Sequence, residues 1–111
     1  MTKIGIIVAT NDADTVWNTF RFANTALDGG HVVRTFLLGR GVEIPKIDDP
    51  KYKDLIKEER DKFDSFKGGI IACRTCPSMR QEKDWDYSPI ATMKDMLDIV
   101  EWADKILVFS G

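Results

Sequence analysis

The sequence predicts an α/β protein, with a three-layer α/β/α sandwich built around a mainly parallel sheet of four to five strands. Short apolar segments rich in β-branched residues alternate with longer amphipathic segments, and this order implies right-handed crossovers between parallel strands. The expected strands cover Ile4–Ala9, Val32–Leu38, Gly68–Ala72 and Lys105–Phe109, with a minimal strand at Ile90–Ala91. The length of 111 residues favours a single domain over residues 1–111.

The first helix is expected between the first two strands, where apolar residues recur along one helical face. These residues are Val16, Phe20, Ala23 and Leu27. Asp12 or Asp14 is available as its N-cap, because a carboxylate accepts from the first free backbone amides. Gly29 and Gly30 then end it.

Two further helices are expected in the second half of the chain. The glycines of Gly39-Arg40-Gly41 end the second strand, Ile44–Pro50 follows as a linker, and about Pro50–Phe66 predicts a solvated amphipathic helix. Thr92 and Asp95 resemble a capping box that opens the last helix. The apolar face of that helix is expected to consist of Met93, Met96, Leu97 and Val100.

Charge and hydropathy exclude several partners. Sixteen basic and eighteen acidic residues give a net charge of −2, and neither sign forms a block, so we expect no nucleic acid and no membrane surface as partner. No apolar run approaches the length of about 20 residues that a membrane span needs. The N-terminal residues lack the pattern of a signal peptide, and a cytoplasmic location is therefore expected.

The two cysteines, Cys73 and Cys76, carry the clearest chemical signal in the chain. They follow a buried strand in a Cys-x-x-Cys pattern, and without an export signal such thiols are more often catalytic, redox-active or metal-binding than structural. A helix that begins at Cys73 would favour its thiolate, and Arg74 and Arg80 would add to this effect. The alternative is that both cysteines are small apolar core residues.

Metal and nucleotide sites have weaker support. Zinc needs about four ligands, and His31 lies at the opposite edge of the sheet, so we expect no metal site within one chain. An all-thiolate site shared by two protomers stays open. Thr10 and Asn11 follow the first strand as a phosphate loop would, but the segment lacks the glycine pattern of dinucleotide sites. A flavodoxin-like mononucleotide site is retained as a lesser alternative, and the acids beside this loop are better explained as helix caps.

The carboxyl ends of parallel strands meet at one edge of a sheet, where ligands collect. Thr10, Asn11 and Ser110 are therefore candidate substrate-binding residues together with Arg74 and Arg80. Aromatic residues, including Trp17, are assigned mainly to the core or to subunit contacts.

The chain resembles the DsrE/DsrF-like family of sulfur-relay proteins over nearly its whole length. The segments that carry the resemblance are Lys3–Asp12, Trp17–Ala23, Phe36–Val42, Ala72–Cys76 and Ala103–Phe109. The resemblance implies a small α/β sandwich, assembly into dimers, trimers or hexamers, and a persulfide on a cysteine at a strand end. By motif that cysteine corresponds to Cys73, Arg80 to the arginine that follows it, and Cys76 to the second cysteine of two-cysteine members.

The sequence therefore favours a cytoplasmic sulfur carrier or sulfurtransferase subunit. Sulfur donor and acceptor proteins are the expected partners, and no cofactor is expected. Two alternatives stay open: a thiol redox switch that uses a Cys73–Cys76 disulfide, and a non-catalytic binding or assembly subunit. A chain of this size offers only a shallow crevice, so a homo-oligomer is also expected, with some of the surface of Trp17, Trp85 and Trp102 at its contacts.

Overall fold

The computed structural model describes residues 1–65, 69–73 and 90–110. In this part of the chain five strands form one sheet in the order β4-β3-β2-β1-β5, and each neighbouring pair is parallel. The strands are β1 (Lys3–Val8), β2 (Val32–Leu37), β3 (Gly69–Cys73), β4 (Ile90–Ala91) and β5 (Lys105–Phe109). The helices are α1 (Ala13–Asp28), the 3₁₀ helix η1 (Gly39–Lys46), α2 (Lys53–Ser65) and α4 (Met93–Trp102).

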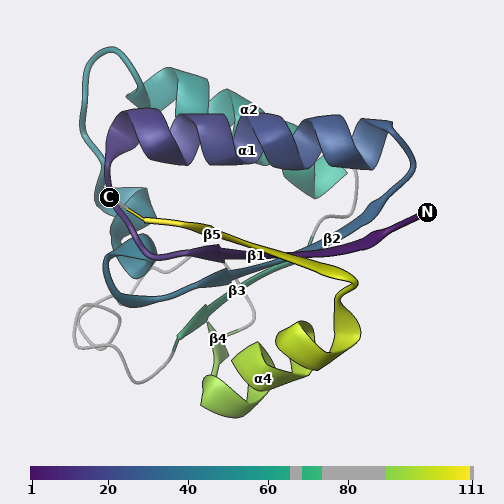
Figure 1. Cartoon of the computed structure of the whole chain (residues 1–111). Coiled ribbons are helices and arrows are strands. Elements are labelled where there is room, and N and C mark those ends of the chain that lie inside the picture. Colours follow the sequence, from purple (N-terminus) through teal and green to yellow (C-terminus); the bar gives the residue numbers. More distant parts are fainter. Residues whose placement is uncertain (66–68, 74–89, 111) are drawn as a thin grey trace.

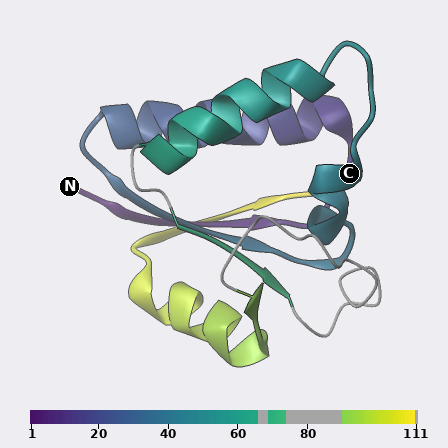
Figure 2. The same cartoon turned by 180° about the vertical axis from the view of Figure 1, so that it is seen from behind.

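Helices cover both faces of the sheet. Helices α1 and α2 lie together on one face and α4 lies on the other (Figure 1), and the view from behind shows the same three layers (Figure 2). The predicted α/β sandwich with a parallel sheet is therefore confirmed.

The main core lies between the sheet and the pair α1 and α2. The rings of Phe20 on α1 and Phe63 on α2 meet edge to face, with centroids 5.9 Å apart, and both are buried. Asn24 on α1 joins the two helices, because its Nδ2 donates to the carbonyl oxygen of Glu59 at 2.8 Å and to its Oε1 at 3.1 Å. The sheet contributes the other buried apolar side chains of this layer, among them Ile6, Val8, Val33 and Leu37.

The ends of α1 follow the caps that the sequence predicts. Asp12 is the N-cap: its Oδ2 accepts from the Thr15 amide at 3.0 Å and from the Thr15 hydroxyl at 2.7 Å. Gly29 is the C-cap, and Gly30 has a φ of 86°. The backbone can therefore leave the helix in the left-handed region, which a side chain disfavours.

The segment after β2 differs from the prediction. Residues that were expected to end the second strand and to begin a linker form η1 instead. Val42 and Ile44 are buried, and a 3₁₀ helix allows both side chains to reach the core from a short segment. The glycines that were expected to end the second strand therefore belong to a helical element.

The face that α4 turns to the sheet also differs from the predicted face. Of the four residues predicted for it, only Met96 packs against the core, whereas Met93, Leu97 and Val100 are 49%, 55% and 41% exposed. Ile99 is the buried residue of α4, because the helix approaches β1 at Gly5. A Cβ at Gly5 would lie 2.9 Å from Ile99 Cγ2, so glycine makes room for this side chain.

His31 lies at the opposite edge of the sheet, as expected, and has a structural role there. Its Nδ1 accepts from the backbone amide of Thr2 at 3.0 Å, beside the start of β1 and β2. This places His31 at the edge away from the strand ends that carry the candidate site.

One buried hydroxyl lacks a hydrogen-bond partner in the part of the chain that the structure describes. Thr35 of β2 is 2% exposed, and its Oγ1 has no partner. Thr19 of α1 is equally buried, but its hydroxyl donates to the carbonyl oxygen of Thr15 at 2.7 Å. Burial of an unpaired hydroxyl costs about 1–3 kcal/mol, so the two threonines should respond differently to loss of the hydroxyl.

We therefore predict that Thr35→Val raises the free energy of unfolding by about 1 kcal/mol, because the isosteric methyl group removes the unpaired oxygen. Urea unfolding at neutral pH measures the change. Thr19→Val is the matched control and should lower stability, since it removes a made hydrogen bond. A loss of stability in Thr35→Val would contradict the prediction.

Candidate functional site

The strand register aligns one row of residues along the carboxyl edge of the sheet. Val8 pairs with Leu37 and with Phe109, and Leu37 pairs with Ala72. The next residues in the four strands are therefore neighbours in the order Ser110, Ala9, Leu38 and Cys73. Two backbone hydrogen bonds continue the ladder into this row, from Ala9 N to Phe109 O at 2.8 Å and from Leu38 N to Val8 O at 2.9 Å.

Cys73 is the last residue of β3, and its Cα pairs with Ala91 of β4. Neighbouring strands are about 4.8 Å apart, so Cys73 lies about 10 Å from the end of β1 and about 15 Å from the end of β5. Ser110 is exposed and sits at that far end of the row. Ser110 and Cys73 are thus brought to one edge but are not brought into contact within one chain.

Three predicted site residues, Arg74, Cys76 and Arg80, lie outside the described residues. Of the predicted site residues, the structure therefore describes the positions of four: Cys73, Thr10, Asn11 and Ser110.

The loop after β1 is held by its own polar side chains. Thr10 is 1% exposed, and its Oγ1 accepts from the Asp12 amide at 3.0 Å. Asn11 is half-buried, and its Nδ2 donates to Glu43 Oε1 at 3.0 Å. Asn11 thereby ties the β1–α1 loop to η1.

Glu43 is the residue that sequence reasoning missed. It stands on η1, the element that follows β2, and it is half-buried against the β1–α1 loop. The sequence did carry a signal for Glu43, because this charged residue closely follows the glycines that end the second strand. Loops at the carboxyl edge of a parallel sheet line the crevice where ligands bind.

A glycine explains how η1 comes so close to β1. A Cβ at Gly41 would overlap the carbonyl oxygen of Val8, so no side chain fits at this position. The Gly41 amide also donates to Leu38 O at 2.9 Å, which turns the chain back over the end of β1. Glu43, two residues further on, is placed beside Asn11 as a result.

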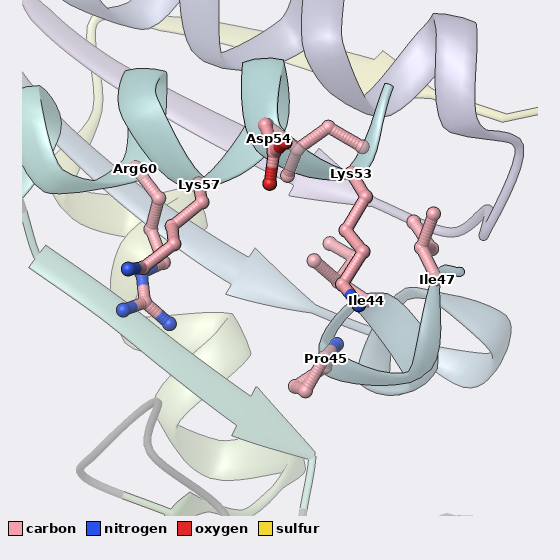
Figure 3. Close-up of a pocket in the computed structure, with 8 residues that line it drawn as sticks. Ile44, Pro45, Ile47, Lys53, Asp54, Lys57 and Arg60 are labelled. Carbon is pink, nitrogen blue, oxygen red and sulfur yellow. The ribbon is translucent and has the colours of Figure 1, made fainter. Parts of the chain in front are cut away.

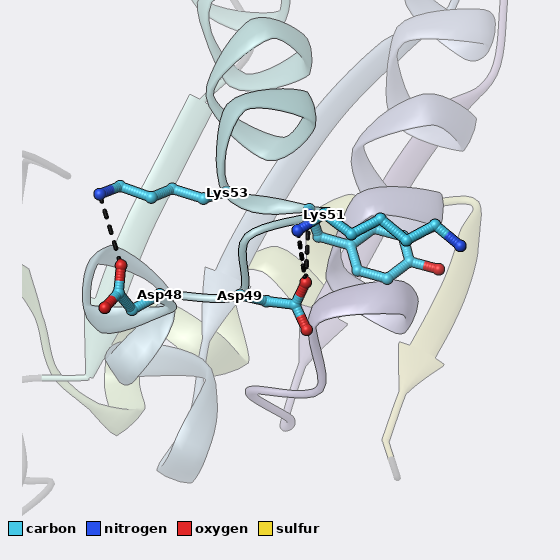
Figure 4. Close-up of polar contacts among 5 residues, drawn as sticks. Asp48, Asp49, Lys51 and Lys53 are labelled. Atoms are coloured by element: carbon cyan, nitrogen blue, oxygen red, sulfur yellow. Dashed lines mark hydrogen bonds and ion pairs between the residues drawn. The ribbon is translucent and has the colours of Figure 1, made fainter.

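Acidic residues line a hollow of about 510 Å³ next to this loop. Two of its carboxylates are helix caps. Asp12 caps α1, and Asp49 Oδ1 accepts from the amides of Lys51 at 2.8 Å and Tyr52 at 3.2 Å, where α2 begins (Figure 4). Asp48 pairs with Lys53 Nζ at 3.4 Å in the same view.

These contacts assign the acids to structural roles. Within residues 1–65, 69–73 and 90–110, no group of three His, Cys, Asp or Glu side chains is arranged to hold a metal ion. The expectation that these acids cap helices is confirmed for Asp12.

The aromatic residue Trp17 also has a structural role. The ring of Trp17 lies 5.7 Å from that of Tyr52, and the Arg21 guanidinium carbon lies 4.6 Å from its centroid. Trp17 is half-buried and packs α1 against the start of α2.

Among the helices described, none combines the length and the apolar character that crossing a membrane requires.

The fold has a known counterpart. The crystal structure of the Escherichia coli protein YchN, which has a DsrE/DsrF-like fold, matches this chain with a TM-score of 0.78. The match covers 98% of this chain and 100% of YchN at 21% sequence identity. The expected DsrE/DsrF-like fold is therefore confirmed at the level of architecture.

The sequence also has a relative. The uncharacterized protein MJ0989 of Methanocaldococcus jannaschii is 30% identical over 102 residues, which cover 84% of this chain and 85% of that protein. The chain belongs to the same family as MJ0989. No family model matches the sequence.

Acid should weaken the cap of α1. Hydrogen bonds from the Thr15 hydroxyl, and then from its amide, hold the pKa of Asp12 below its ordinary value of 3.8. The ionised carboxylate therefore stabilises the folded chain above pH 3.8, and this stability is lost as the pH falls through the lowered pKa of the folded state.

We predict that Asp12→Asn, which keeps a good N-cap but does not titrate, shows a shallower fall in stability between about pH 4 and about pH 2. Urea midpoints measured across this range provide the comparison. Asp98→Asn, at an exposed position of α4 away from both capping sites, should follow the unmodified chain. If stability falls equally steeply with pH in Asp12→Asn and in the unmodified chain, ionisation of the Asp12 cap does not contribute to the pH dependence of stability.

Proposed function

We propose that this protein is a sulfur carrier that holds sulfane sulfur as a persulfide on Cys73. The position of Cys73 carries the proposal: it ends a central strand at the edge where the β1–α1 loop and η1 also meet. In parallel sheets this edge is where ligands bind. The DsrE/DsrF-like architecture supports the same assignment.

The proposed reaction is a thiol–persulfide exchange. The Cys73 thiolate attacks the outer sulfur of a donor persulfide, R–S–SH, and the S–S bond of the donor breaks. The new S–S bond gives Cys73–S–SH, which loses its proton to solvent to become Cys73–S–S⁻, and the donor leaves as the thiolate R–S⁻. An acceptor thiolate repeats the exchange, takes the outer sulfur and restores the Cys73 thiolate.

Anion binding at the site would come from groups next to Cys73. The persulfide is anionic at neutral pH, and backbone amides together with an arginine are the groups that hold anions at such strand ends. We assign this role to Arg74 and Arg80. The Asn11–Glu43 hydrogen bond keeps the neighbouring loop in place, so these two residues position the edge of the site.

The redox switch is the competing use of the same thiols. If Cys76 attacks the inner sulfur of Cys73–S–SH, a Cys73–Cys76 disulfide forms and HS⁻ leaves. A carrier and a switch therefore differ in how long the persulfide survives.

Substitutions of the two cysteines should have different effects in a sulfur-loading assay. We predict that Cys73→Ser takes up no sulfur from a cysteine desulfurase and cysteine, because a serine hydroxyl is not ionised at neutral pH. Cys76→Ser should load as the unmodified chain does and keep the persulfide longer. Intact mass spectrometry detects the added sulfur atom.

The contrary results are distinct. Loading of Cys73→Ser but not of Cys76→Ser would move the nucleophile to Cys76. Rapid disulfide formation without retained sulfur would favour the redox switch, and two inert thiols would favour a non-catalytic assembly subunit.

We also propose that the chain assembles into a homo-oligomer. Strand β5 is an edge of the described sheet, so one row of its backbone groups is available to another strand. On the α4 side of the sheet this edge carries the exposed residues Ile106 and Val108. The outer face of α4, with Met93, Leu97 and Val100, continues the apolar surface on that side. A second copy of the chain that pairs with β5 would cover the exposed residues of β5 and the apolar outer face of α4.

Light scattering at micromolar concentration should report a dimer or larger species. Val108→Lys should lower the assembled mass, because a charge at this edge opposes strand pairing. Val32→Lys changes the same residue type at an exposed position of β2 and should leave the mass unchanged. A monomer in the unmodified chain, or equal effects of the two variants, would contradict the proposal.

A further inference from the structure

The open edge of the sheet at β5 carries apolar side chains on both faces. On the α4 side, Ile106 and Val108 are 36% and 60% exposed. On the α1 side, Leu107 and Phe109 pack against the core, and the exposed Phe22 ring has its centroid 6.4 Å from that of Phe109. In the described sheet no strand lies beyond β5. A strand added at this edge would therefore be held by apolar contacts on both of its faces.

The hydrogen-bond pattern of β5 shows which of its backbone groups are available to such a strand. The carbonyl oxygen of Phe109 accepts from the Ala9 amide at 2.8 Å, so the backbone of Phe109 faces β1. Backbone groups of successive residues point to opposite sides of a strand. The amides and carbonyl groups of Ile106 and Val108 therefore point away from the sheet, whereas those of Leu107 face β1.

We infer that β5 pairs with β5 of a second copy in antiparallel direction, about a two-fold axis at Leu107. The inference rests on the assembly proposed above and specifies its geometry. A closed dimer of identical chains uses one self-complementary surface, and a two-fold axis normal to the sheet reverses the strand direction. Backbone hydrogen bonds form only where outward-facing residues lie opposite each other, so the axis falls at Ile106, Leu107 or Val108. An axis at Leu107 pairs the whole of β5 with its copy.

This register also matches the side chains. Ile106 of each copy lies opposite Val108 of the other, which gives apolar cross-strand pairs on the α4 side and lets their backbone groups exchange hydrogen bonds. On the α1 side, the exposed Lys105 of each copy lies opposite Phe109 of the other, in a pair of the type whose side chains come closest. Its ammonium group reaches the rings of Phe109 and Phe22, and a cation over an aromatic face is attracted to it. An axis at Ile106 or Val108 does not bring these groups together.

The same geometry keeps the two sulfur sites of a dimer apart. Because the axis reverses the strands, the carboxyl edge of one copy points away from that of the other. Cys73 ends β3, which lies three strands from β5, so the two Cys73 residues are at least about 30 Å apart. At this interface neither copy contributes a residue to the other's site. Each protomer then carries sulfur independently, and partner proteins approach the two sites from opposite edges.

Single cysteines distinguish the three registers, in a background of Cys73→Ser and Cys76→Ser. Leu107→Cys should form a disulfide-linked dimer under mild oxidation, since the Cα atoms of a non-hydrogen-bonded antiparallel pair are about 4.5 Å apart. Ile106→Cys and Val108→Cys should each give at least about ten-fold less dimer alone, because each Cα would lie about 8 Å from its own copy. Mixing these two proteins should restore crosslinking. Non-reducing gel electrophoresis measures the dimer.

Val32→Cys, at an exposed position of β2, is the control and should not crosslink. Self-crosslinking of Ile106→Cys or Val108→Cys as fast as that of Leu107→Cys would overturn the register. Suppose that the protein assembles in light scattering but neither Leu107→Cys nor the mixture crosslinks: the copies then meet at another surface, and this inference fails while the assembly stands. A monomer in light scattering would remove both. Sulfur loading is measured on the unmodified chain, so failure of this interface and failure of the persulfide chemistry are distinguishable.

Discussion

The close approach of η1 to the end of β1 is the constraint on which the candidate site depends. Gly41 lies against the carbonyl group of Val8, where the chain has no room for a side chain. This contact holds η1 above the strand ends and leaves Glu43 within hydrogen-bond distance of Asn11. The loops after β1 and β2 thereby form one unit at the edge where β3 delivers Cys73. A bulkier residue at Gly41 would displace a wall of the site without touching Cys73.

Helix η1 also separates two electrostatic environments. On one side are the acids that cap α1 and α2, and on the other are the cations of α2. Helix caps place carboxylates near the positive ends of helices, so they explain the acidic side without a ligand. On the basic side, shown in Figure 3, Lys53 stands at the start of its helix, where helix geometry makes a cation unfavourable.

A second glycine contact governs the other face of the sheet. Because Gly5 makes room for Ile99, α4 turns this residue inward and leaves Leu97 facing solvent. The apolar surface on this side therefore results from how the helix docks. Its position beside the edge strand β5 links the packing of the chain to its proposed assembly.

Much of this fold is determined by local sequence. The apolar runs, the Asp12 cap and the Gly29 stop act within one element, so periodicity and capping chemistry predict them. The placement of Cys73 at a strand end follows from the same local pattern. Tertiary structure decided the rest: which face of α4 is buried, that the glycines after β2 enter a 3₁₀ helix, and that Glu43 meets Asn11. Each of these depends on contact between elements distant in the chain, and the space beside a glycine is set by the neighbour that packs there.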